Sequence, residues 1–183
     1  SLTKFWFKMD KKTINSEKPS FSQSINIANQ WCKDWEEELL SDEVLADRVA
    51  ELVKTKNGLR GFFAYALSDI NCSLLDKLPS SLTFKFIEGG EKIVEITLKN
   101  LIMSSAQVIN HRRDKNPEYE EMSKNISDRC INILKILNTN LVNDKVNMFL
   151  NNLDNLGNSM NNSSKYDLQQ KKFIREKILE IAK

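Results

Sequence analysis

Apolar residues recur at alternating spacings of three and four along most of this chain, and that period is the strongest constraint on its fold. Residues spaced in this way lie on one side of an α-helix, so each such stretch predicts a helix with one buried face. The repeat is clearest in residues 25–39 and 119–137. With five Gly and three Pro in 183 residues, a loop-rich all-β fold is disfavoured. The sequence predicts a mainly α protein, a compact bundle of six or seven helices.

Local signals place several helix ends. Ser20, followed by Gln23, forms a capping box at the start of the first helix. Ser41 is the expected N-cap of the second, with two acidic residues after it. Asn57-Gly58 predicts a left-handed end to that helix. Further helices are expected from about Leu59, Lys99, Asn116, Leu141 and Ser164.

Residues 82–98 depart from the helical period. Apolar and polar residues alternate on either side of Gly89-Gly90, which predicts an inserted β-hairpin between the third and fourth helices. Its apolar face would carry Phe84 and Phe86. Because a lone hairpin is barely stable in water, we expect that face to pack on helices or on another chain. These two aromatic residues are therefore candidate interaction residues.

The expected domain organisation is an N-terminal arm, residues 1–19, before a single helical domain, residues 20–183. The arm carries Phe5, Trp6 and Phe7 among lysines. Such a mixture packs on its own domain, packs on a neighbouring subunit, or stacks on single-stranded bases. A net charge of only +2 makes nucleic acid an improbable partner. Whether Met9 or an earlier residue is the natural start stays open.

Cysteine usage and hydropathy predict the compartment. The three Cys are widely spaced and odd in number, which favours reduced, buried thiols in the cytoplasm. No apolar run is long enough for a transmembrane helix, so no membrane association is expected. His111 is the only His, which excludes a multi-histidine metal site within one chain. We expect no metal and no cofactor.

Two basic segments are candidate anion sites. His111, Arg112 and Arg113 are consecutive, and arginine forks suit carboxylate or phosphate groups. Arg60 follows Gly58 and precedes Gly61 at a predicted helix start, where backbone N–H groups can hold an anion. Both segments also have a purely structural interpretation. The first suits the end of a helix, and the second suits a tight turn in which Gly61 permits close helix packing.

Residues 33–51 are strongly acidic. An exposed helix face is the simpler interpretation, and a metal or cationic-partner surface is the alternative.

Two stretches resemble a known group of proteins. They are Lys56-Asn57-Gly58-Leu59-Arg60-Gly61-Phe62-Phe63 and Lys99-Asn100-Leu101-Ile102-Met103-Ser104-Ser105-Ala106, the latter continuing into His111-Arg112-Arg113. Together they resemble small, soluble, uncharacterised proteins of cyanobacteria and plastids, over residues 40–137. The resemblance carries no catalytic signature and implies no particular activity.

The expected function is a non-enzymatic cytosolic binding or assembly module that acts through protein–protein contacts, including self-association as a homodimer. The alternative is a small-molecule or anion-binding enzyme, which requires Arg60 to meet His111, Arg112 and Arg113 around one pocket. A weaker alternative is single-stranded nucleic-acid binding by the N-terminal arm.

Overall fold

The computed structural model describes residues 18–155 and 165–182, which form eight helices and no strand. This confirms the mainly α prediction, with more helices than the six or seven expected. The helices are α2 (Phe21–Glu36), α3 (Asp42–Leu52), α4 (Lys56–Ser68), α5 (Ser80–Gly89), α6 (Glu91–Arg113), α7 (Pro117–Ile136), α8 (Thr139–Asn155) and α9 (Leu168–Glu180). Phe5, Trp6, Phe7, Met9 and the helix start expected at Ser164 lie outside the described residues.

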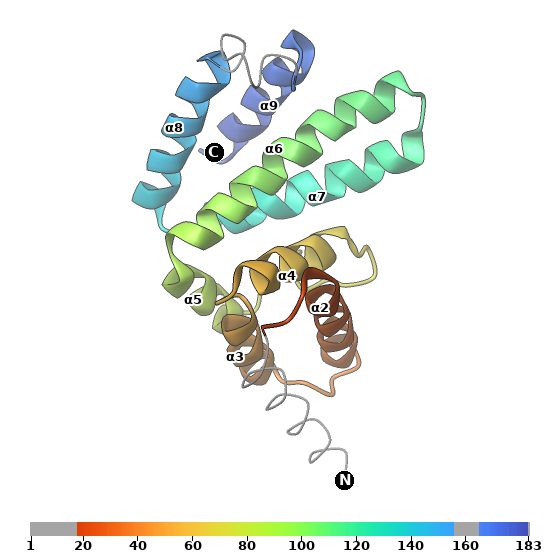
Figure 1. Cartoon of the computed structure of the whole chain (residues 1–183), viewed down its shortest axis with the longest axis vertical. Coiled ribbons are helices and arrows are strands. Elements are labelled where there is room, and N and C mark those ends of the chain that lie inside the picture. Colours follow the sequence, from red (N-terminus) through yellow and green to blue (C-terminus); the bar gives the residue numbers. More distant parts are fainter. Residues whose placement is uncertain (1–17, 156–164, 183) are drawn as a thin grey trace.

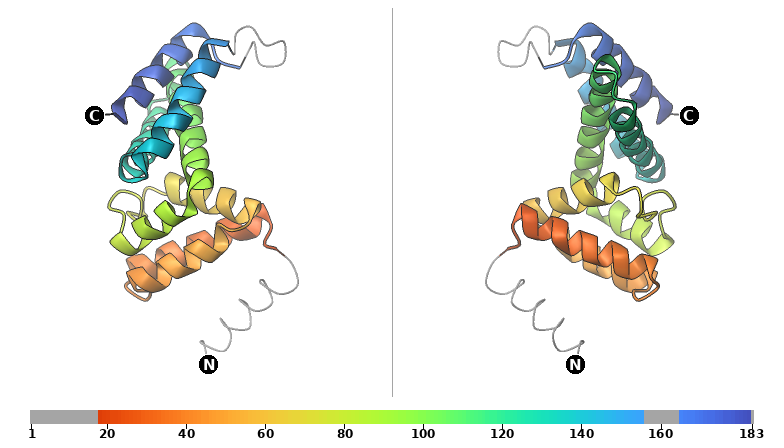
Figure 2. Two further views of the ribbon diagram at one scale, coloured as in Figure 1. Left: turned by 90° about the vertical axis from the view of Figure 1, so that its left-hand side faces the viewer. Right: turned by 90° about the vertical axis from the view of Figure 1, so that its right-hand side faces the viewer.

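Helix α6 is the centre of the fold. It runs antiparallel to α7 as a long pair, and α8 and α9 pack beside that pair (Figure 1). At the start of α6, α2 packs on α4 and α3 packs on α5, so that these four helices gather at one end of the molecule (Figure 2). A buried aromatic cluster of Phe62, Phe63 and Phe86, with ring centroids 5.4 to 6.3 Å apart, joins α4 to α5.

The predicted helix starts at Ser20, Ser41 and Asn116 are confirmed. The Ser20 hydroxyl accepts from the Gln23 backbone N–H at 3.1 Å, and the Gln23 side chain accepts from the Ser20 N–H at 2.8 Å. The predicted helix end at Asn57-Gly58 is wrong. Helix α3 already ends at Leu52, and the Thr55 hydroxyl caps α4, so both residues lie in the first turn of α4.

The predicted β-hairpin is also wrong, because residues 82–98 belong to α5 and α6. Leu82 and Phe86 are buried one helical turn apart, so the same residues that alternate also satisfy a helical period. Phe84 was expected on the buried face; in the helix it points away, and it is 60% exposed. Gly90 separates the helices with φ +63° and ψ −134°, a conformation that glycine adopts most readily.

Among the described residues, no helix is both long enough and apolar enough to cross a bilayer.

Candidate functional site

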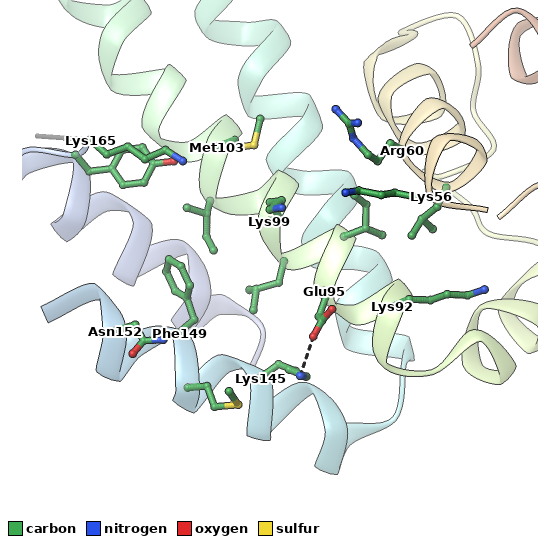
Figure 3. Close-up of a pocket in the computed structure, with 16 residues that line it drawn as sticks. Lys56, Arg60, Lys92, Glu95, Lys99, Met103, Lys145, Phe149, Asn152 and Lys165 are labelled. Carbon is green, nitrogen blue, oxygen red and sulfur yellow. Dashed lines mark hydrogen bonds and ion pairs between the residues drawn. The ribbon is translucent and has the colours of Figure 1, made fainter. Parts of the chain in front are cut away.

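A cavity of about 650 Å³ opens between α4, α6 and α8 and reaches residues 165 and 166 (Figure 3). This volume is within the range of ligand sites in proteins. Its apolar surface includes Leu59, Ile96, Ile102, Met103, Met148 and Phe149. Of the residues that the structure describes, six cationic side chains and one carboxylate, that of Glu95, line the cavity. The cations are Lys56, Arg60, Lys92, Lys99, Lys145 and Lys165. We call this cavity the cationic groove.

Helical spacing explains how the sequence builds the groove. Lys56 and Arg60 are four residues apart, so they share one face of α4. Lys92 and Lys99 are seven residues apart, so they share one face of α6. The turn that joins α3 to α4 is tight at Gly58. A Cβ on Gly58 would lie 1.9 Å from the Leu52 carbonyl oxygen, so the turn into α4 requires glycine there.

Three of the cations have partners within the protein. Lys145 donates to Glu91 and, at 2.8 Å, to Glu95; these carboxylates raise the pKa of the lysine, and Lys145 in turn lowers the pKa of Glu91. Lys92 donates to the Val53 carbonyl oxygen at 3.1 Å, which caps the end of α3. The Lys165 ammonium lies 5.6 Å from the ring centroid of the adjacent Tyr166.

The other three cations are not neutralised. Lys56, Arg60 and Lys99 are exposed and form no ion pair or hydrogen bond with the described residues. The Arg60 guanidinium lies over the Phe21 ring, 5.1 Å from its centroid.

Their placement carries an electrostatic cost in the unliganded protein. Like charges four residues apart destabilise a helix by about 0.2–0.5 kcal/mol, and Lys56 and Arg60 form such a pair. Lys56 is also the first residue of α4, where the helix dipole disfavours a cation by about 0.3–1 kcal/mol. Lys99 reaches the same region from α6 (Figure 3). A bound anion would relieve both repulsions.

The basic cluster at the end of α6 does not join Arg60. His111 follows Met103 by eight residues, which places it about 12 Å farther along the helix. Neither His111, Arg112 nor Arg113 lines the cationic groove. The structure therefore does not assemble the shared pocket that the enzymatic alternative requires.

The arginines of that cluster instead join neighbouring helices. Arg112 donates to the Glu120 carboxylate of α7 at 2.6 Å. Arg113 donates to both carboxylate oxygens of Asp167, at 2.5 and 3.0 Å, and this lowers the pKa of Asp167 to about 2. The His111 ring lies 5.6 Å from the Tyr119 ring. These contacts fit the structural interpretation of the segment.

The acidic segment, residues 33–51, is mostly exposed. Part of it is used within the fold. Glu36 accepts from the backbone N–H and the hydroxyl of Ser73 at 2.6 and 2.8 Å. Asp42 accepts from the indole N–H of Trp35 at 2.7 Å. Within the part of the chain that the structure describes, no three His, Cys, Asp or Glu side chains are grouped to hold a metal ion.

Arg129 is a buried residue that sequence reasoning missed. Its side chain is 5% exposed and forms an ion pair with Asp76. It also donates to the carbonyl oxygens of Ala66 and Leu67, at the end of α4, at 3.0 and 3.2 Å. The available signal was its position on α7, between apolar residues three before it and four after it. Its role is to hold the end of α4 and the following loop.

The cysteines are buried, as predicted. A hydrogen bond with Cys72 raises the pKa of the Cys32 thiol and lowers that of Cys72. Burial alone raises the pKa of Cys130.

Of the predicted interaction residues, the structure exposes one and buries another. Phe84 lies on the outer face of α5, near the 43% exposed Ile87, whereas Phe86 belongs to the core.

A family model described as Uncharacterised conserved protein UCP020893 matches residues 20–181. The chain belongs to this family. The match includes every helix described above, and therefore the whole cationic groove. No curated protein matches the chain, and no solved structure matches it. The expected likeness to cyanobacterial and plastid members stays a prediction.

Proposed function

We propose that this protein is a non-enzymatic cytoplasmic binding module that acts through protein–protein contacts, with the cationic groove as its docking surface. The observation that carries the proposal is the set of three uncompensated cations, Lys56, Arg60 and Lys99, beside an apolar surface. The remaining polar groups of the groove give no separate support for catalysis, since Glu95 is bound to Lys145.

The partner that fits this surface is an acidic amphipathic helix of another protein. Its apolar face would contact Met103, Met148 and Phe149, and its carboxylates would lie against Lys56 and Lys99. Helices dock in apolar grooves in this way, and methionine side chains adapt to the surface they meet. Complementary charge would orient the helix and speed its association.

Fluorescence anisotropy with a labelled peptide tests this function. The probe is an amphipathic helix of about 18 residues, five turns, with leucines on one face and glutamates on the other. A matched peptide carries lysine in place of every glutamate. We expect saturable binding of the acidic peptide, weakened by added salt, and no binding of the basic one.

Two charge-reversal variants locate the binding. Lys56→Glu combined with Lys99→Glu is expected to weaken acidic-peptide binding by a factor of about ten or more. The control combines Lys124→Glu with Lys135→Glu, two exposed lysines of α7 outside the groove, and is expected to bind as the unmodified protein does. Absent binding, or equal losses in the two variants, would refute the proposal. Light scattering during the titration shows whether a second copy of the chain occupies the groove instead.

A further inference from the structure

We infer that Lys56, Arg60 and Lys99 form a binding site for a phosphate dianion, and that the helix docked in the groove carries a phosphorylated side chain. The inference rests on the proposed function, since it names the chemistry of the same partner.

The first observation is how the three cations are arranged. Lys56 and Arg60 project from adjacent turns of α4, and Lys56 extends toward Lys99 on α6 (Figure 3). Glu95, the carboxylate of the groove, is turned to Lys145. Among the described residues, no other acidic side chain lines the groove. The three positive charges therefore line the same groove without a counterion among the described residues.

The second observation is the number and type of donors. A phosphate monoester carries a charge of about −1.5 to −2 at neutral pH and three acceptor oxygens, more than a carboxylate offers. One arginine fork and two lysine point charges supply donors for all three oxygens. The positive end of the α4 dipole, at Lys56, adds to the same potential. A single carboxylate would leave part of this charge unneutralised.

The third observation is the position of the cluster relative to the apolar surface. Lys56 and Arg60 lie on the α4 side of the groove, whereas Phe149 lies on the α8 side (Figure 3). Leu59 lines the groove from the same turn of α4 as the two cations. A helix seated on the apolar surface would thus present one flank to the cluster. A phosphorylated residue on that flank would meet the cations while the helix covers the apolar residues.

Three versions of the acidic peptide test the inference, with phosphoserine, glutamate or serine at one position of the polar face. At about pH 7.5, where the phosphate is dianionic, we expect the phosphopeptide to bind about tenfold more tightly than the glutamate peptide. That advantage should diminish below about pH 6, as the phosphate takes up a proton.

Neutral variants assign the advantage to the cluster. We expect two variants to reduce the affinity of the phosphopeptide relative to the glutamate peptide. One combines Lys56→Gln with Lys99→Gln, and the other is Arg60→Gln alone. The control, Lys124→Gln combined with Lys135→Gln, should retain the phosphopeptide advantage. All five residues are exposed, and circular dichroism checks that each variant is folded. A phosphopeptide that binds no better than the glutamate peptide, or an advantage that survives in the double variant, would overturn the inference.

Two further probes identify the source of the phosphate. Inorganic phosphate is compared with chloride at equal ionic strength by thermal unfolding, and vesicles containing phosphatidic acid are tested by co-sedimentation. If phosphate stabilises the unmodified protein but not Lys56→Gln/Lys99→Gln, the result supports the anion site, whether or not a peptide binds. Absence of peptide binding in that case would refute only the proposed function. Binding of vesicles or free phosphate as tight as that of the phosphopeptide overturns the assignment to a phosphorylated partner. Binding of all three peptides with equal affinity overturns the phosphate site alone.

Discussion

Replacing the buried Arg129 by methionine is the most informative test of how this fold is held together. The guanidinium pairs with Asp76 through Nε at 2.9 Å and Nη2 at 3.0 Å. Its Nη1 donates to the carbonyl oxygens of Ala66, Leu67 and Asp69, and its Nη2 donates to that of Cys72. Methionine fills much of the same space without any donor, so the variant isolates the loss of polar contacts from the creation of a cavity.

The expected cost follows from these contacts. Removing one partner of a buried ion pair costs about 3–5 kcal/mol, and a buried carbonyl left without a donor costs about 1–3 kcal/mol. Asp76 is half exposed and regains solvation. The contact to the Asp69 carbonyl is only partly buried, whereas those to the other three carbonyls are buried. We therefore expect Arg129→Met to lower the free energy of unfolding by about 3–5 kcal/mol. For a chain of this size, that lowers Tm by roughly 6–20 °C.

Urea unfolding followed by circular dichroism and tryptophan fluorescence measures this loss. Asp76→Asn is the comparison, because it removes only the charge of the exposed partner, and we expect it to cost about 1 kcal/mol. The half-buried Arg48→Met is a control for removing an arginine elsewhere. A loss of less than about 1 kcal/mol for Arg129→Met, or one no larger than that for Asp76→Asn, would show that the carbonyl contacts do not stabilise the fold.

Three further predictions concern backbone space, backbone conformation and pH. In Gly61→Ala the new Cβ would lie 2.5 Å from the Ser24 Cβ, so α2 and α4 must separate; urea unfolding should show a loss of about 1–3 kcal/mol, and an unchanged midpoint would contradict that contact. Gly90→Ala places an alanine at φ +63° and should cost about 1–2 kcal/mol by the same assay, whereas a gain in stability would mean that the α5–α6 junction relaxes freely. The pKa of Asp167 is lowered from 3.8 to about 2 by Arg113, so the stability this carboxylate contributes is present above pH 3.8 and is lost as the pH falls toward 2. Because Asn caps a helix as well as Asp does, Asp167→Asn should lose less stability than the unmodified protein over that interval; equal losses in urea midpoints would refute the role of the pair.

Residues 82–98 have an ambiguous sequence pattern. Leu82 and Phe86 suit one face of a strand and one face of a helix equally well, because both elements bring residues four apart to the same side. Burial of the second run against α7 favours the helix, and only the packed structure contains that information. On α5, packing against α3 and against Phe62 and Phe63 of α4 places Phe86 in the core and leaves Phe84 on the outer face.

The candidate site was partly visible in the sequence. Arg60 was identified as an anion candidate, and it lines the cationic groove. Lys99 lay within the stretches that carry the resemblance, but nothing in the linear sequence indicated that it faces Lys56. The structure does not bring Arg60 together with His111, Arg112 and Arg113. Arg60 lies on α4 at the groove, whereas the other three residues end α6, about 12 Å beyond Met103, the last residue of that helix that lines the groove.

Features with local causes can be predicted from the amino-acid sequence of this protein. These features depend on residues within a few positions of one another, so neighbouring residues predict them. They are the helical period, the buried thiols and the helix caps at Ser20, Ser41 and Asn116. The tertiary structure alone decided which cations meet and which are neutralised. Arg129 reaches carbonyls about sixty residues away, and Lys145 reaches Glu91 and Glu95 from α8. Such contacts depend on how helices cross, and helix crossing is set by the packing of all the buried faces together.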